Sequence, residues 1–126
     1  MIEWDVTMIY SESRNKWMFR LNRDHNTGSL VLPAGFEMDF TTSPRILWGI
    51  VPQISRANRA SANHDYRYIN TVGTRKQADD IFLREMLEDG VPAWKAKLMY
   101  VYVRALAWYN WNKYKRRNID NKHFIV

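Results

Sequence analysis

The 126-residue sequence contains no cysteine, so the chain forms no disulfide and offers no thiolate ligand to a metal. Glycine and proline are few, five and four residues, and neither gathers into a linker. The longest apolar stretch, residues 98–111, is too short to span a bilayer and contains Arg104 and Asn110. Glu3 and Asp5 stand where a secretory signal would be basic and then apolar. We predict a single domain with no signal peptide and no membrane partner.

The composition is that of a globular domain, with 46% hydrophobic and 25% charged residues. The formal net charge is +6, and much of the excess lies near the C-terminus. Aromatic residues make up 14% of the chain, including six Trp and seven Tyr. A small core absorbs only part of this aromatic area, and Trp and Tyr are favoured at interfaces. We therefore expect some of the Trp and Tyr side chains to make surface contacts with a partner, in addition to those that lie in the core.

Short alternating segments separated by polar turns predict β-strands in the first forty residues. Helical signals dominate the rest, including a capping box from Thr74 to Gln77, a stop at Gly90 and a start at Pro92. The predicted helices cover residues 56–69, 74–90 and 92–115. We predict an α+β domain over residues 1–115, with a small antiparallel sheet (a β-meander) packed against three C-terminal helices. Residues 116–126 are predicted to form a basic tail.

The helical period places some charged residues on apolar faces. Asp79 shares a face with Leu83 and Met86, whereas its neighbour Asp80 falls on the solvent side. A bare buried carboxylate is costly, so Asp79 needs a partner. On the first helix the inner face holds Ala57, Ala60, Ser61, His64 and Tyr68, with Asp65 beside it. The outer face is predicted to hold Arg56, Asn63, Arg67 and Asn70.

Several separated motifs resemble one known family. Residues 32–45 contain a Gly-Phe pair, Asp39 three residues later, hydroxyl residues and then Pro-Arg. Residues 64–68 form a His-Asp motif on a predicted helix. Further matches are Arg75, Asp79, Phe82, Met86, residues 90–92, Tyr100 and Arg104. In this order, over about residues 32–111, the motifs resemble the DUF1353 family of phage and prophage proteins. Thr42 stands where the family usually has Ser, and Ala107 where Gly is expected.

The resemblance implies a phage context but no agreed activity, so function has to be argued from the residues. The first hypothesis is a bacteriophage structural or assembly-associated protein, a minor virion or tail-region component acting through protein–protein contacts. The third predicted helix is apolar on several faces, and such a helix is buried or meets a partner. The expected partners are other phage proteins or further copies of the chain, in the host cytoplasm during infection or in the virion. The interaction residues expected are Trp94, Tyr102, Trp108, Tyr109, Trp111, Lys115, Arg116 and Arg117.

The alternative hypothesis is a metal-dependent hydrolase. Asp39, His64 and Asp79 are of the types that bind a divalent metal ion. His64 and Asp65, with Thr42 as a nucleophile and Arg45 as an anion clamp, complete the candidate catalytic set. This hypothesis predicts a divalent metal ion as cofactor.

Two further interpretations remain open. The inward polar residues also fit a structural network, in which the carboxylates pair with Arg45, Arg75 or Arg104 and His64 bonds to a backbone carbonyl. The basic C-terminal segment and its aromatic neighbours indicate a nucleic acid as a less favoured partner.

Overall fold

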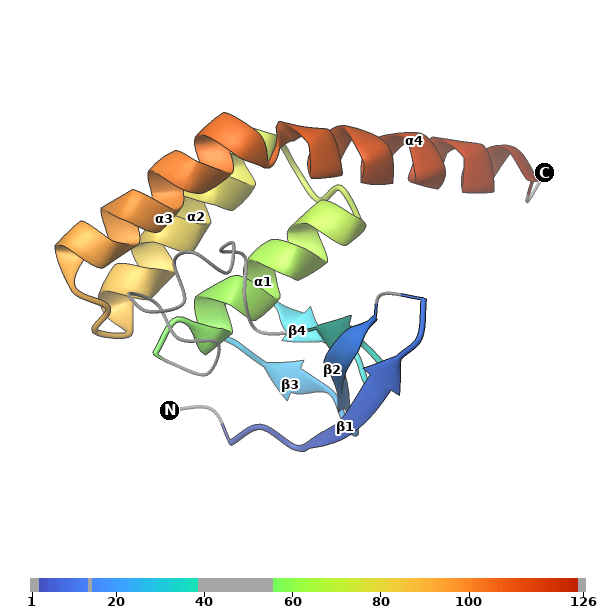
Figure 1. Cartoon of the computed structure of the whole chain (residues 1–126), viewed down its shortest axis with the longest axis horizontal. Coiled ribbons are helices and arrows are strands. Elements are labelled where there is room, and N and C mark those ends of the chain that lie inside the picture. The colour runs from blue at the N-terminus through green and yellow to red at the C-terminus, as the bar shows by residue number, and fades with distance from the viewer. Residues whose placement is uncertain (1–2, 14, 39–55, 125–126) are drawn as a thin grey trace.

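The computed structural model describes residues 3–13, 15–38 and 56–124, with the side chains of Lys16 and of residues 120–124 left out. Within these residues, five short β-strands precede four α-helices, which confirms the predicted α+β class (Figure 1). No helix of the described part of the chain has both the length and the apolar character needed to cross a membrane.

The principal sheet has three antiparallel strands in the order β1-β2-β5. Strand β1 (Val6–Ser11) and strand β2 (Lys16–Leu21) form a hairpin, and β5 (Glu37–Met38) pairs with the other edge of β2. The chain does not run through the sheet as the continuous meander that was predicted. Strands β3 (His25–Asn26) and β4 (Val31–Leu32) leave the sheet between β2 and β5 and form a two-stranded ladder of their own.

The β3–β4 turn is shaped by Gly28, whose φ of +93° lies in the left-handed region that glycine adopts most readily. This turn brings residues 27–30 against the helices, where their polar groups take part in a buried network described below. The sheets and the first helix share a small apolar core built from Leu21, Leu32, Met38 and Ala62.

Helix α1 (Asn58–Ile69) and helix α2 (Arg75–Glu88) pack against each other, and helix α3 (Ala93–Leu106) packs on α2. The start of α2 is the predicted capping box, since the Thr74 hydroxyl accepts from the Gln77 N–H and the Gln77 side chain accepts from the Thr74 N–H. The chain leaves α2 through Gly90, which has a φ of +86°. A core containing Ala60, Phe82, Met86, Met99 and Val103 lies between the three helices.

The prediction of one long helix over residues 92–115 is wrong in one respect, because helix α3 ends at Ala107. Helix α4 (Trp108–Phe124) follows, so residues 116–124 are helical where a tail was predicted. The described part of the chain thus has four helices rather than three. Near the break, the Arg75 guanidinium donates to the carbonyls of Val103 at 3.1 Å and Arg104 at 3.2 Å. These contacts satisfy carbonyl groups at the end of α3. In Figure 1, α4 extends away from the other helices toward the C-terminus.

Candidate functional site

The candidate site is centred on a buried pair, His64 of α1 and Asp79 of α2. His64 Nε2 lies 2.7 Å from Asp79 Oδ1, and the two side chains are only 3% and 0% exposed. Sequence reasoning placed each residue on an inward face, and the structure brings them into direct contact. The structural network predicted for these residues is confirmed in part, since Asp79 pairs with Arg75 and Arg104. The partner of His64 is a carboxylate rather than the predicted backbone carbonyl.

Helical spacing explains why the two side chains meet. Ala60, His64 and Tyr68 recur at intervals of four along α1 and are all buried. On α2, Asp79 is buried in the same way, one helical turn before the core residue Phe82. Because α1 and α2 pack on each other, these two faces lie opposite each other.

Four donors surround the Asp79 carboxylate. Its Oδ1 accepts from His64 and from the Tyr68 hydroxyl, at 2.7 Å in both cases. Its Oδ2 accepts from Arg104 Nη1 at 2.9 Å and lies 3.5 Å from Arg75 Nη1. Burial alone raises the pKa of the Asp79 carboxyl, but the hydrogen bonds from His64, Tyr68 and Arg104 outweigh burial and lower the pKa overall. Asp79 is therefore a buried, ionised carboxylate.

His64 is held as a neutral ring with a defined proton. Burial lowers the pKa of His64, and the opposing effect of Asp79 does not restore it to its ordinary value. The contact with Asp79 favours the tautomer that has its proton on Nε2, which leaves a lone pair on Nδ1. Nδ1 is buried and has no hydrogen-bond partner among the described residues. The rings of Tyr68 and Phe82, with centroids 4.3 Å and 4.6 Å from that of His64, fix its orientation.

Burial raises the pKa of the Tyr68 hydroxyl, and its hydrogen bond to Asp79 adds to that effect. Tyr68 thus stays protonated and donates to the carboxylate. The site consequently holds one buried, unprotonated imidazole nitrogen on a ring that is oriented by the Asp79 carboxylate. A general base needs such a nitrogen, together with a path by which the proton donor reaches it.

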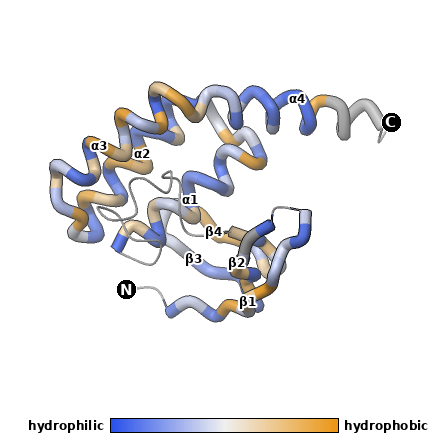
Figure 2. The backbone as a smooth tube through the Cα atoms, viewed as in Figure 1, coloured by the Kyte–Doolittle hydropathy of each residue, from blue (hydrophilic) through white to orange (hydrophobic). Residues whose placement is uncertain are grey.

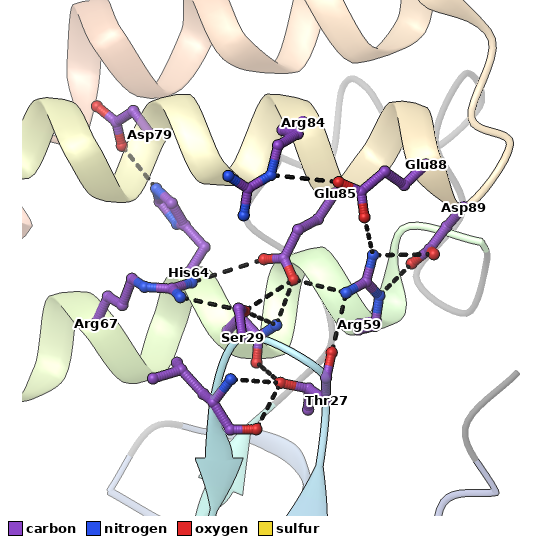
Figure 3. A network of polar contacts seen from close by, with 12 residues as sticks. Thr27, Ser29, Arg59, His64, Arg67, Asp79, Arg84, Glu85, Glu88 and Asp89 are labelled. Atoms are coloured by element: carbon purple, nitrogen blue, oxygen red, sulfur yellow. Dashed lines mark hydrogen bonds and ion pairs between the residues drawn. The ribbon is translucent and has the colours of Figure 1, made fainter.

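A second buried polar network, centred on Glu85 of α2, was not predicted from the sequence (Figure 3). Glu85 Oε2 accepts from Arg59 Nη1 at 2.8 Å, Asn63 Nδ2 at 2.8 Å and Ser29 Oγ at 3.0 Å. Arg67 Nη1 lies 3.6 Å from Glu85 Oε1, and Arg67 Nη2 donates to Ser29 Oγ at 3.2 Å. The network joins the β3–β4 turn to both helices.

The outward assignment of Asn63 and Arg67 was wrong, since both are buried. Their positions follow the same helical period as Ala60 and His64, and that period was the available signal. Two long polar side chains on α1 can face inward because Glu85, itself 1% exposed, supplies the matching charge and acceptors. The partner lies on another helix, which helical period alone does not reveal.

The remaining residues predicted for a catalytic or metal site do not join the His64–Asp79 pair in the described part of the chain. Asp39, Thr42 and Arg45 lie outside the described residues. Asp65 is half-buried on α1 beside His64. Within the described ranges, no three His, Cys, Asp or Glu side chains come close enough together to hold a metal ion. The Asp79 oxygens already face four donors, two of them guanidinium groups, so these contacts suit an orienting role rather than metal coordination.

The candidate interaction residues divide into two groups. Trp94, Trp108 and Tyr109 are exposed, and so are the basic residues Lys115, Arg116 and Arg117 of α4. Trp111 is buried at 8% exposure, because its indole packs edge-on against Tyr68. Tyr102 is partly buried against the helical core. Trp111 is thus a core residue, and its prediction as an interaction residue was wrong.

The family model described as "Protein of unknown function (DUF1353)" matches residues 16–103, more than half of the chain. The chain therefore belongs to the DUF1353 family. The match includes His64, Asp79 and the whole Glu85 network. Neither a curated protein nor a solved structure matches the chain.

Proposed function

We propose that this protein is a hydrolase in which His64 acts as general base and Asp79 orients it. The observation that supports the proposal is the His64 ring, neutral and buried, with Nε2 bonded to Asp79 and Nδ1 without a partner in the described part of the chain. A buried polar atom without a partner is uncommon in native proteins, and catalysis is one reason why such an atom is kept.

The proposed reaction is the hydrolysis of an ester by water. The Nδ1 lone pair takes a proton from a water molecule, whose oxygen forms a bond to the electrophilic carbon or phosphorus of an ester. Asp79 stabilises the imidazolium that results, since Oδ1 lies 2.7 Å from Nε2. The imidazolium then returns the proton to the leaving alkoxide as the ester bond breaks. Tyr68, Arg75 and Arg104 act through Asp79 and are positioning residues.

The test is a panel of chromogenic carboxylic esters, phosphomonoesters and phosphodiesters, assayed with wild type, His64→Gln and His25→Gln. Loss of a general base lowers the rate by on the order of 10²–10⁴-fold, so we expect that loss in the first variant. His25 is a matched control, because it is also buried but belongs to β3, away from the pair. Equal rates in wild type and His64→Gln on every hydrolysed substrate would contradict the proposal.

The metal-dependent form of the hydrolase differs in one measurable respect. In that form Asp39, His64 and Asp79 would hold a divalent ion, which would supply the activation of the water. In the form proposed here, water is activated by His64 alone, because Asp79 is committed to His64, Tyr68 and the two arginines. Metal analysis of the purified protein and activity in the presence of a chelator separate the two forms. Activity that persists in a chelator supports the form proposed here.

A second candidate function is the bacteriophage structural or assembly-associated role. It is favoured by exposed apolar side chains along α3 and at the start of α4, with Trp94 60%, Val101 62% and Trp108 52% exposed. Large exposed apolar surfaces commonly mark contacts with a partner. In this role the protein would act through other phage proteins, in the host cytoplasm or within the virion. Detection of the chain in purified particles, by mass spectrometry of virions, tests this candidate.

A further inference from the structure

Helix α3 has an apolar face on the side opposite its core contacts. Ala96, Met99 and Val103 are buried against α2, whereas a second set of apolar residues on α3 is exposed. This second set, which we call the α3 stripe, consists of Trp94, Leu98, Val101 and Ala105. Figure 2 shows hydrophobic positions recurring along α3, in contrast to the largely hydrophilic α4.

The spacing within the α3 stripe is four, three and four residues. This is the alternation of core positions in a heptad repeat, which packs one helix along another at a shallow angle. The stripe extends over most of α3, from Trp94 at 60% exposure to Val101 at 62% and Ala105 beyond it. Trp108 continues the spacing but belongs to α4, beyond the break at Ala107. The α3 stripe therefore has the pattern expected for contact with a single partner helix.

The residues that flank the α3 stripe are basic. Lys97 and Arg104 lie along one side and Lys95 along the other, in the positions that form charge pairs between helices in a heptad arrangement. Lys95 Nζ lies 5.4 Å from the centroid of the Trp94 ring, so this charge is close to the stripe. Arg104 donates to Asp79, and its charge is partly balanced there. Lys95 and Lys97 thus set the sign of the surface.

We propose that the α3 stripe docks an acidic amphipathic helix of another protein, with apolar residues facing the stripe and carboxylates facing Lys95 and Lys97. Charge complementarity selects this occupant. A second copy of the chain would oppose its own Lys95 and Lys97 to like charges, which is unfavourable. The proposal names the partner chemistry for the assembly-associated role on which it rests, and it is independent of the hydrolase.

The experiment uses the full-length chain and two synthetic helical peptides about three heptads long. Both peptides have Leu at the a and d positions; one has Glu and the other Lys at the e and g positions. Binding is measured by fluorescence anisotropy of labelled peptide, at low and at high salt. We expect the Glu peptide to bind at least about tenfold more tightly than the Lys peptide, with the difference shrinking as salt screens the charges.

Two variants locate the contact. Val101→Glu places a charge in the α3 stripe and should weaken binding of the Glu peptide at least about tenfold. Val31→Glu is the matched control, because Val31 of β4 is 57% exposed and away from α3, and it should bind like wild type. Lys97→Glu should shift preference from the Glu peptide toward the Lys peptide. All three substitutions alter exposed side chains, and unchanged circular dichroism and melting would confirm that the fold is intact.

The other results each overturn the proposal in a different way. Equal binding of both peptides, lost in Val101→Glu, would show a docking stripe without acidic selectivity. Concentration-dependent dimerisation that Val101→Glu abolishes, seen by sedimentation velocity, would assign the stripe to a second copy. Absence of binding to either peptide would remove the stripe as a helix-docking surface. In each case, detection of the chain in virions still decides the assembly role separately.

Discussion

Asp79 is ionised although its side chain is fully buried, and the reason is its four donors. Removing one partner of a buried charged group leaves the others uncompensated. The carboxylate is therefore both the group that orients His64 and the group that neutralises Arg75 and Arg104 at the ends of α2 and α3.

The substitution Asp79→Asn should lower the free energy of unfolding by about 3–5 kcal/mol, because two guanidinium groups lose their carboxylate. The matched control is the next residue, Asp80→Asn. Asp80 pairs with Lys76 at 2.6 Å, but on the exposed side of α2, where ion pairs contribute little. Urea unfolding of both variants is the measurement. Equal losses in the two variants would contradict the burial and pairing described for Asp79.

The pH dependence of stability follows from His64. In the folded state burial lowers the pKa of His64 from its ordinary value of about 6.5, so the unfolded chain binds this proton at higher pH than the folded chain does. Stability from this group is complete above about pH 6.5 and falls as the pH decreases below it, by at most about 1.4 kcal/mol per pH unit. Asp79, whose pKa is also lowered, adds a further loss below about pH 3.8.

Urea unfolding of wild type and His64→Gln at a series of pH values between about 4 and 8 measures this effect. The contribution of His64 is the difference between the free energies of unfolding of the two proteins at each pH. The variant lacks the titrating ring, so its stability should change less between about pH 6.5 and 5 than that of the wild type. Parallel curves for the two proteins would contradict a lowered pKa for His64. Hydrolytic activity should be retained through neutral pH and lost as His64 becomes protonated.

Sequence reasoning identified His64 and Asp79 because each stands on an apolar face, where a polar residue is conspicuous. It did not identify their contact, since period along one helix says nothing about which residue of another helix lies opposite. The alternation of residues 16–21, with Trp17, Phe19 and Leu21 on one face, predicted that Trp17 would be buried and Met18 exposed. Trp17 is 54% exposed and Met18 is 3% exposed, the reverse of the simple alternation from Trp17 through Phe19 to Leu21. Met18 and Leu21 are both buried, so β2 has buried side chains on both faces.

The β3–β4 turn is held to the helices chiefly through polar groups. Thr27, Ser29 and Asn63 are linked by hydrogen bonds, and Glu85 is the acceptor at the centre. Arg59 also donates to the Thr27 carbonyl at 2.9 Å and to Asp89 through two nitrogens. The turn is therefore held by hydrogen bonds that converge on one buried glutamate side chain.

Glu85→Gln should destabilise the protein by about 3 kcal/mol, because Arg59 and Arg67 lose their buried counter-charge. Glu88→Gln is the control, since Glu88 also pairs with Arg59 but is 53% exposed. Hydrogen exchange in the β3–β4 turn should increase in the first variant and not in the second. Unchanged protection of the Thr27 and Leu30 amides in Glu85→Gln would show that the network does not hold the turn.

The capping box at the start of α2 was predicted from Thr74 and Gln77 and is confirmed by both hydrogen bonds. Thr74→Ala should cost about 1 kcal/mol, measured by chemical denaturation. Gly73→Ala is unsuitable as a control, because Gly73 has a φ of +69°. Lys76→Ala, an exposed change in the same turn, is suitable. A cost for Thr74→Ala no greater than that of the control would contradict the cap.

The break between α3 and α4 could not be predicted, because Ala107 neither lacks a backbone N–H nor has unusual φ/ψ angles. At the break, the guanidinium of Arg75, a residue of another helix, donates to the carbonyls of Val103 and Arg104. The same arginine lies 3.5 Å from Asp79. Arg75 thus connects the candidate site to the point where α4 turns away from the other helices.

The molecule as a whole combines two features that support different functions. One is the buried His64–Asp79 pair between α1 and α2, and the other is the exposed α3 stripe with its basic flanks. The stripe residues face away from the α2 side of α3, so substitutions there should leave the His64–Asp79 pair intact. The protein can therefore be tested for catalysis and for docking with separate variants.

The most direct test of the proposed general base is alkylation of the protein by a small α-bromoketone, which reacts with a neutral imidazole nitrogen that has a free lone pair. His64 offers such an atom in Nδ1, which is buried, so the reagent reaches it only when the surrounding structure opens. His25 is the internal control: it is 2% exposed, against 3% for His64, but Nε2 accepts from the Asp5 N–H at 2.9 Å and Nδ1 lies 2.8 Å from the Arg23 carbonyl. Cleavage after Lys and Arg places His25, His64 and His123 on separate peptides for mass spectrometry.

We expect selective modification of His64, with loss of hydrolytic activity in proportion to the modified fraction and slower reaction in Asp79→Asn. Modification of His64 no faster than that of His25, in a protein that remains folded and active, would contradict the assignment of His64 as the base.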